Sequence, residues 1–152
     1  CSQISPVLVK MIRTVMATIF TYGSLMCEDI LAAVTGQNLV FDEAHLLDYE
    51  RYAVRDEEYP AIIPKTASTV QGRVYYGVNE EGVARLDSFE GDYYQRIMLS
   101  VNVSGRALEA QSYVFRDEYR GFLADWRWDF EYFLQHGKQK FTSQYLGYQR
   151  LV

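Results

Sequence analysis

Hydrophobic and polar residues follow one another along the chain in blocks that predict short strands and helices. The near-continuous apolar run Val15–Phe20 has the length of a buried strand. Gly23 interrupts it, and apolar positions in Met26–Val34 then recur at helical spacing, with acidic residues in the first turn and Gly36 as a stop. The N-terminal part therefore predicts a strand, a glycine turn and a helix.

The middle of the chain predicts strands followed by a short helix. His45–Arg55 has an imperfect β-like alternation, and the prolines of Tyr59–Pro64 favour an extended segment along an edge or in a loop. Gly72–Val78 is rich in valine and tyrosine and is typical of a strand. Asn79 is a predicted N-cap for a helix that runs to Phe89.

Two further segments predict a β-hairpin. Arg96–Val103 and Ala107–Arg116 both alternate between apolar and polar residues. The residues between them, Ser104-Gly105-Arg106, have the composition of a tight turn. We expect the two segments to pair as antiparallel strands.

The C-terminal part predicts an amphipathic helix after Asp125. Its apolar stripe falls at positions i, i+4, i+7 and i+8, occupied by Trp126, Phe130, Phe133 and Leu134. Gly137 is expected to end this helix, and a last helical piece covers Lys138–Tyr145. In this interpretation Trp126 and Phe130 belong to the core.

The predicted elements describe an α+β fold, in which about six strands form a curled sheet or small mixed β-barrel with helices packed outside. No repeat or linker divides the chain, so residues 14–152 are expected to form a single domain. A chain of 152 residues can bury a proper core. Residues 1–13 are expected to be an N-terminal extension or a cloning remnant, since the chain begins with Cys1.

Composition narrows the class of protein. Hydrophobic residues make up 49% and charged residues 23%, as in an ordinary globular domain, and the net charge of −5 argues against nucleic acid or an anionic membrane as a partner. The opening segment Val7–Arg13 is too short and too charged to span a membrane. Two cysteines form no disulfide framework, which favours a reducing compartment. We expect a cytoplasmic monomer.

The candidate catalytic residue is Glu90. It follows Val83 and Leu86 at i+7 and i+4, so it shares the face that docks the predicted helix and should be partly buried. Burial and the negative end of the helix dipole would both raise the pKa of the carboxyl toward the range of a general base. The alternative is a structural role, in which Glu90 pairs with Arg73, Arg85 or Arg96 or reaches water.

The candidate binding loop is Tyr22-Gly23-Ser24-Leu25, where a strand passes through a glycine turn into a helix. Main-chain N–H groups at such a turn can hold an anion or a developing oxyanion. The alternative is purely structural: Gly23 supplies a positive φ, and Ser24 caps the next helix.

Other chemistries find no support in the sequence. Ser24 is not in a G-x-S-x-G motif, which disfavours a serine triad, and no phosphate-binding glycine motif is present. Histidines and cysteines lack metal-ligand spacing, so no metal and no cofactor is expected. Aromatic residues make up 15% of the chain and could line a pocket, but their spacing more often indicates core.

Four segments in order resemble the γ-glutamylcyclotransferase-like family and its avirulence-induced-gene-like branch. They are Tyr22-Gly23-Ser24-Leu25, Tyr59-Pro60-Ala61, Gly72-x-Val74-Tyr75 and Leu86-Asp87-x-x-Glu90-Gly91-x-x-Tyr94-x-Arg96. The resemblance covers about residues 15–116. It implies a small mixed barrel with a cavity at its mouth, and conversion of a small-molecule γ-glutamyl amide or peptide to 5-oxoproline and a free amine or amino acid.

The resemblance also implies roles for particular residues. Glu90 matches the catalytic glutamate of the family, and Tyr113 resembles a pocket tyrosine. Tyr94 and Arg96 are expected to support Glu90. The segment that cradles the substrate would be Tyr22, Gly23, Ser24, Leu25, Met26 and Cys27.

The leaving group stays open at the level of sequence. A peptide, a γ-glutamyl-ε-lysine and a simple amine are all compatible with the motifs, whereas the motifs of the glutathione-specific branch are not found. Two other classes of function also remain: a catalytically silent module that binds a small molecule, and a protein-interaction domain of the same fold, which would need an exposed apolar patch such as Trp126–Phe133.

Overall fold

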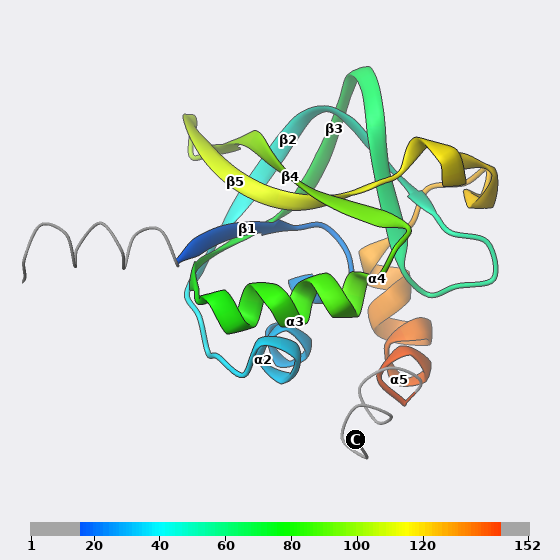
Figure 1. The fold of residues 1–152 in the computed structure, drawn as a ribbon. Coiled ribbons are helices and arrows are strands. Elements are labelled where there is room, and N and C mark those ends of the chain that lie inside the picture. Colours follow the sequence, from blue (N-terminus) through cyan, green and yellow to red (C-terminus); the bar gives the residue numbers. More distant parts are fainter. Residues whose placement is uncertain (1–15, 144–152) are drawn as a thin grey trace, which may run out of the picture.

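A closed five-stranded barrel forms the centre of the part of the chain that the computed structural model describes, residues 16–143 (Figure 1). Around the barrel the strands follow the order β1-β3-β2-β4-β5. Neighbouring strands are antiparallel, except that β1 runs parallel to β5 and so closes the barrel. Their bounds are Ala17–Thr21 (β1), Phe41–Ala53 (β2), Pro60–Val78 (β3), Tyr94–Val103 (β4) and Arg106–Phe115 (β5). The predicted small mixed barrel is confirmed.

The long strand β3 explains why the barrel has fewer strands than the sequence predicts. The two predicted segments Tyr59–Pro64 and Gly72–Val78 belong to this one strand. It pairs with β2 from Pro60, opposite Ala53, to Tyr75, opposite Phe41. Two prolines in one half made that half look like a separate edge or loop segment, but its main chain is extended and paired with β2.

The helices after β1 and β3 form where the sequence predicts them, although α2 begins at Glu28, two residues after the predicted start at Met26. A short 3₁₀ turn, η1 (Ser24–Met26), leads into α2 (Glu28–Thr35), which ends at Gly36 with φ of 74°. Asn79 caps α3 (Glu80–Glu90), because its Oδ1 accepts a hydrogen bond from the Gly82 N–H at 2.7 Å. Figure 1 shows α2 and α3 side by side outside the barrel, and they contact each other.

The predicted hairpin is confirmed. Along β4 and β5 the register runs from Tyr94 opposite Phe115 to Val103 opposite Arg106. The turn residues Ser104 and Gly105 both have positive φ, 52° and 81°, as a tight two-residue hairpin turn requires.

The prediction for the C-terminal helix is wrong in its start and its end. Asp129 caps the helix by accepting the Glu131 N–H at 3.0 Å, so the helix begins at Phe130, and Trp126 lies outside it with 63% of its surface exposed. Gly137 does not end the helix but belongs to a π-helical turn. In order the segments are 3₁₀ η2 (Asp117–Phe122), α4 (Phe130–Tyr132), π-helical η3 (Phe133–Gly137) and α5 (Lys138–Phe141).

The wide π turn changes which side chains face the core. Phe133 is buried, whereas Leu134, predicted for the same stripe, is 38% exposed, and Phe130 is only partly buried. Trp128 takes the buried position that the sequence assigns to Trp126. The predicted extension, residues 1–13, and the end of the last predicted helix lie outside the described residues.

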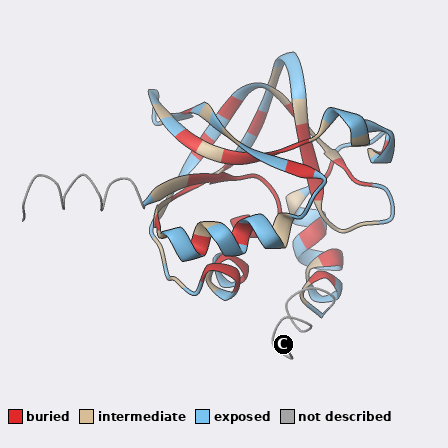
Figure 2. Ribbon diagram, in the orientation of Figure 1, coloured by how far each residue is buried: buried red, intermediate tan, exposed pale blue. Residues whose placement is uncertain are grey.

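Two hydrophobic clusters hold the fold together, one inside the barrel and one between the barrel and the helices (Figure 2). Ile19 and Phe20, adjacent on β1, point to opposite sides and belong to different clusters, as strand alternation requires. The barrel interior receives at least one residue from every strand, including Phe20, Ala44, Val74, Val101 and Ala110. Within residues 16–143, no helix has the length and apolar character to cross a membrane.

Candidate active site

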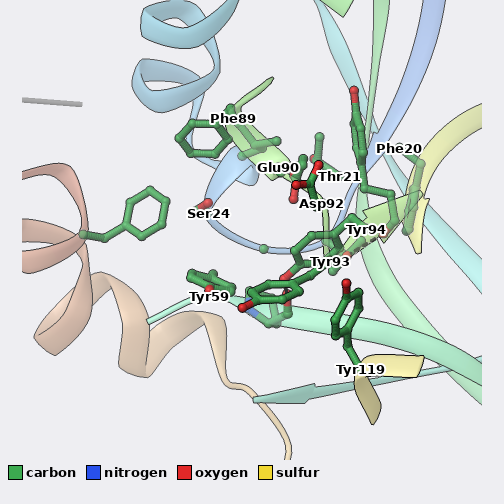
Figure 3. Close-up of a pocket in the computed structure, with 17 residues that line it drawn as sticks. Phe20, Thr21, Ser24, Tyr59, Phe89, Glu90, Asp92, Tyr93, Tyr94 and Tyr119 are labelled. Atoms are coloured by element: carbon green, nitrogen blue, oxygen red, sulfur yellow. Dashed lines mark hydrogen bonds between the residues drawn. The ribbon is translucent and has the colours of Figure 1, made fainter. Parts of the chain in front are cut away.

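A cavity of about 390 Å³ opens at the mouth of the barrel (Figure 3). Its wall comes from the exit of β1, the start of β3, the end of α3 with the start of β4, the end of β5 and the C-terminal segment. The lining residues are Phe20, Thr21, Tyr22, Gly23, Ser24, Leu25, Tyr59, Pro60, Phe89, Glu90, Gly91, Asp92, Tyr93, Tyr94, Tyr113, Tyr119 and Phe141.

The parallel pairing of β1 and β5 brings two distant segments to the same mouth. Ile19 pairs with Gln111, so the loop after β1 and the last residues of β5 leave the barrel in the same direction. The Tyr22 hydroxyl donates a hydrogen bond to the Tyr113 carbonyl at 2.6 Å, and the Ser112 hydroxyl donates one to the Phe20 carbonyl at 2.9 Å. These bonds tie the predicted binding loop to the strand that carries Tyr113.

Gly23 allows a close approach between two chain segments. Its φ is negative, −136°, and a Cβ placed on it would lie 2.7 Å from Pro60 Cγ and Cδ. The interpretation that Gly23 supplies a positive φ is therefore wrong, since the space beside Pro60 is what requires glycine. Ser24 does not cap α2 either, because Cys27 occupies the N-cap position and Ser24 begins η1.

The turn after Gly23 carries two cavity-lining residues, Ser24 and Leu25, and is closed by main-chain hydrogen bonds. The Met26 N–H donates to the Gly23 carbonyl and the Cys27 N–H to the Ser24 carbonyl, each at 3.0 Å. The first N–H group bonded within the turn is that of Met26. The N–H groups of Ser24 and Leu25 come earlier in the chain, and the first N–H groups of a helical turn have no acceptor within it. Arg51 fixes the loop from behind, since its Nη1 donates to the Tyr22 carbonyl at 2.7 Å.

The predicted binding segment divides at Leu25. Tyr22 through Leu25 line the cavity, whereas Met26 and Cys27 are buried in the core behind it and do not. The Met26 carbonyl accepts hydrogen bonds from Arg73 Nη1 and the Tyr75 hydroxyl, at 2.6 and 3.1 Å. Burial raises the pKa of the Cys27 thiol.

Glu90 lies at the end of α3, with its carboxyl group at the cavity. Leu86 on the same face is fully buried, and Glu90 itself is half-buried, as the spacing predicts. Burial raises the pKa of the Glu90 carboxyl to about 8, and the nearby Asp87 carboxylate contributes in the same direction. A carboxyl with this pKa can take up and release a proton near neutral pH.

The arginines that could have paired with Glu90 are engaged elsewhere. Each forms an ion pair with another acidic residue: Arg73 with Glu43 at 3.1 Å, Arg85 with Glu81 at 2.6 Å and Arg96 with Asp87 at 2.9 Å. Within residues 16–143, Glu90 takes part in no ion pair. The structural alternative, an ion pair at the end of the helix, is not what the described residues form.

Asp87, one turn before Glu90 on α3, holds the side chains of Tyr113 and Arg96 by hydrogen bonds. It accepts a hydrogen bond from the Tyr113 hydroxyl at 2.7 Å and two from Arg96, from Nε at 2.9 Å and Nη2 at 3.2 Å. Burial, followed by this bond to Asp87, raises the pKa of Tyr113. Tyr94 supports the opposite side, because its hydroxyl donates to the Pro60 carbonyl at 2.8 Å.

The sequence missed most of the cavity's aromatic wall and one of its acidic residues. Tyr59, Tyr93, Tyr94 and Tyr119 surround the opening together with Asp92 (Figure 3). Tyr93 and Asp92 stand inside the Glu90-Gly91-x-x-Tyr94 motif, but no periodicity marks them as lining residues. Only the closure of the barrel brings Tyr119 next to them. Within residues 16–143, no three His, Cys, Asp or Glu side chains are grouped so that they could hold a metal ion.

Comparison with known proteins gives the same picture of the fold. Two Arabidopsis thaliana proteins are similar in sequence: AIG2-like protein D, 31% identical with 86% of this chain and 89% of that protein covered, and AIG2-like protein C, 28% identical with 88% and 80% covered. A solved Arabidopsis thaliana structure superposes with a TM-score of 0.65 at 23% identity, covering 85% of this chain and 87% of that one. A solved γ-glutamyl cyclotransferase superposes with a TM-score of 0.59 at 19% identity, covering 66% and 67%.

The family profile described as γ-glutamyl cyclotransferase, AIG2-like, matches residues 19–130. The match begins in β1 and reaches the first residue of α4, so it includes all five described strands, α3 and most of the cavity wall. The chain belongs to the γ-glutamyl cyclotransferase, AIG2-like family.

Proposed function

We propose that the protein is a γ-glutamyl cyclotransferase, which converts a γ-glutamyl amide or peptide to 5-oxoproline and a free amine or amino acid. The observation that carries the proposal is the state of Glu90: a cavity carboxyl whose pKa is raised to about 8 and which pairs with no cation in the described part of the chain. The cavity also contains the main-chain turn at Ser24 and Leu25. The family membership supports the same reaction.

The reaction begins with a proton transfer from the substrate. Glu90, in its carboxylate form, takes a proton from the α-ammonium group of the γ-glutamyl moiety. This transfer is nearly balanced, because a pKa of about 8 is close to the value of ~8 usual for an α-amino group. The neutral amine then attacks the γ-carbonyl carbon of the same molecule.

The second half of the reaction expels the leaving amine. Attack forms the ring C–N bond and places negative charge on the former carbonyl oxygen, which the N–H groups of Ser24 and Leu25 stabilise. Collapse of this intermediate breaks the original amide bond, and Glu90 returns its proton to the departing nitrogen. The ring nitrogen, which carries two hydrogens after the attack, releases the second proton, and the free amine takes it up in its ammonium form. The atoms of the substrate are divided between 5-oxoproline and the amine, so no water is consumed.

Internal attack explains why the site needs no nucleophilic side chain. Well-oriented intramolecular reactions reach effective molarities of about 10⁵–10⁸ M, so the protein has only to hold the glutamyl chain folded. The loop that would hold it is fixed by Arg51 behind Tyr22 and by the Tyr22–Tyr113 hydrogen bond. A rigid template of this kind suits a reaction that depends on substrate conformation.

The test is release of 5-oxoproline from a panel of γ-glutamyl peptides, γ-glutamyl-ε-lysine and γ-glutamyl alkylamides, with Glu90→Gln as the matched control. We expect the unaltered protein to turn over at least one member and Glu90→Gln to bind it without turnover. Equal turnover by both proteins would reject Glu90 as the base. Binding without turnover by both would instead favour the silent binding module.

A further inference from the structure

We infer that Tyr93, Tyr119 and Asp92 form the subsite for the leaving amine, and that this subsite selects an aromatic amine without a carboxylate. The inference rests on the proposed function, since it assigns the part of the same cavity that the glutamyl group would leave free. It names a substrate class that the motifs leave open.

The aromatic part of the subsite is a cluster of rings at the rim. The centroids of Tyr93 and Tyr119 lie 4.6 Å apart with the rings at 69°, an edge-to-face contact, and Tyr119 stacks on Phe122 at 6.0 Å and 14°. Tyr93, which lines the cavity, is 41% exposed, so part of its surface remains accessible there. Aromatic rings prefer offset or edge-to-face partners, which such a rim offers to an incoming ring.

Two further aromatic pairs line the cavity. Tyr59 and Tyr94 lie 6.4 Å apart at 61°, and Phe89 and Phe141 lie 5.8 Å apart at 72°. The cavity of about 390 Å³ falls within the usual range for small-molecule sites. A flat apolar group therefore finds aromatic contact surface inside it.

The charge of the lining disfavours a carboxylate. Glu90 and Asp92 both line the cavity, and no lysine, arginine or histidine from residues 16–143 does. The nearby Arg96 and Arg116 line a neighbouring hollow that shares Gly91, Asp92, Tyr94 and Tyr113 with the cavity. Each arginine has a partner: Arg96 binds Asp87, and the Arg116 Nε donates to the Asp92 main-chain carbonyl at 3.0 Å. A carboxylate on the leaving group would face Asp92, and among residues 16–143 no cation lines the cavity to compensate.

The positions of Glu90 and the binding loop fix the direction in which the leaving group points. The reacting γ-carbonyl must lie between the Glu90 carboxyl and the N–H groups of Ser24 and Leu25. Asp92 and Tyr93 follow Glu90 by two and three residues on the turn into β4, and Tyr119 lies on η2 after β5. The remaining space beside the reacting centre is thus bounded by these rim residues.

The experiment compares substrates that differ in one feature, using the full chain. γ-Glutamyl-2-phenylethylamide and γ-glutamyl-phenylalanine differ only by a carboxylate, and γ-glutamyl-2-cyclohexylethylamide replaces the aromatic ring by a saturated one. We expect kcat/KM for the phenylethylamide to exceed that for γ-glutamyl-phenylalanine by about tenfold or more, because like charges face each other at the rim. It should exceed that for the cyclohexyl compound by about threefold or more.

Two variants locate the effect. Asp92→Asn should raise the ratio of kcat/KM for γ-glutamyl-phenylalanine to kcat/KM for the phenylethylamide about threefold or more. Tyr119→Leu should lower kcat/KM for the phenylethylamide about threefold to tenfold. It should leave that for γ-glutamyl-methylamide nearly unchanged, since a methyl group is too small to reach the rim.

The outcomes separate this inference from the proposed function. Equal kcat/KM for the phenylethylamide and γ-glutamyl-phenylalanine, or an Asp92→Asn variant that keeps the difference, would overturn the subsite and leave the reaction standing. If no compound is turned over, calorimetric titration measures the affinity of the protein for the same compounds, and the order of these affinities tests the subsite. Binding in the predicted order would support the subsite while the reaction fails, and binding in any other order, or none, would overturn the subsite too.

Discussion

Two shielded glutamates, Glu50 in β2 and Glu90 at the end of α3, show opposite responses to their surroundings. Glu50 has only 5% of its side chain exposed, yet it accepts a hydrogen bond from Ser68 at 2.9 Å and pairs with Lys65 at 3.1 Å and with Arg127. The hydrogen bonds from Lys65 and Ser68 lower the pKa of Glu50, whereas burial raises the pKa of Glu90 to about 8.

The difference lies in the partners and not in the shielding. Glu50 connects β2 to β3 through its ion pair with Lys65, and to the C-terminal segment through its ion pair with Arg127. Its negative charge therefore stabilises the fold. Glu90 faces a cavity with a second carboxylate nearby and no cation among the described residues. A carboxyl that is left without a cation next to an open cavity is the more informative sign of chemistry.

The largest expected difference between the two residues is in turnover. Glu90→Gln should lower kcat for 5-oxoproline release by about 10²–10⁴-fold, the usual contribution of a general acid or base. Glu50→Gln should change kcat by less than about threefold, because Glu50 does not line the cavity. Steady-state kinetics of both variants on one substrate measures this, and comparable losses would break the contrast.

Stability at alkaline pH should separate them next. Because the pKa of Glu90 is about 8 in the folded state and 4.5 as a free group, the folded state binds the extra proton and loses stability as pH rises from about 4.5 to 8. Glu90→Gln should therefore be more stable than the unaltered protein by about 1–3 kcal/mol at pH 9, a figure reduced for the partial access of water. Near pH 4 the two should match in urea unfolding.

Glu50 should show the opposite pH dependence. Its folded pKa is lowered, so it contributes stability above its free value of 4.5, and this contribution is lost as pH falls through the folded pKa. Glu50→Gln should cost about 0.5–1.5 kcal/mol at pH 7, a modest amount because Lys65 and Arg127 reach solvent. Urea unfolding at pH 7 and pH 3 checks this: a loss that persists unchanged at pH 3 would contradict the charge-based explanation.

The smallest expected effect concerns the neighbour that raises the pKa of Glu90. Asp87→Asn removes the repulsion, so the rising limb of kcat/KM against pH should move to lower pH by about half a unit. Tyr113→Phe removes the hydrogen bond to Asp87 without changing charge and should leave the limb in place. A limb that moves equally in both variants would assign the effect to geometry and not to charge.

Local signals in the sequence predicted local structure well. The Asn79 cap, the Gly36 stop, the Ser104-Gly105 turn and the half-buried face of Glu90 all depend on residues within a few positions of one another. The C-terminal helix was misjudged because a π turn shifts the stripe after Phe133, and a fixed helical period cannot foresee such a turn.

The parts of the site that depend on distant contacts were out of reach of the sequence. Gly23 was interpreted through its own backbone, although its requirement comes from Pro60 at the start of β3. The hydrogen bond between Asp87 and Tyr113 joins residues 26 positions apart, and Tyr119 reaches the cavity only because η2 follows β5 at the mouth. Hydrophobic periodicity describes one helix or strand at a time and therefore cannot predict contacts between residues that are distant in the sequence.

The parallel neighbours β1 and β5 have a consequence for how this architecture can diversify. The candidate reacting groups come from the exit of β1 and the end of α3, while Tyr119 comes from η2, which follows β5 and is held at its other end by the hydrogen bond from the Arg55 N–H to the Phe122 carbonyl. No residue of η2 takes part in the pairing of the five strands. If the proposed reaction and leaving-group subsite hold, changes in this one segment would alter the preference for the leaving group while the strand pairing stays as it is.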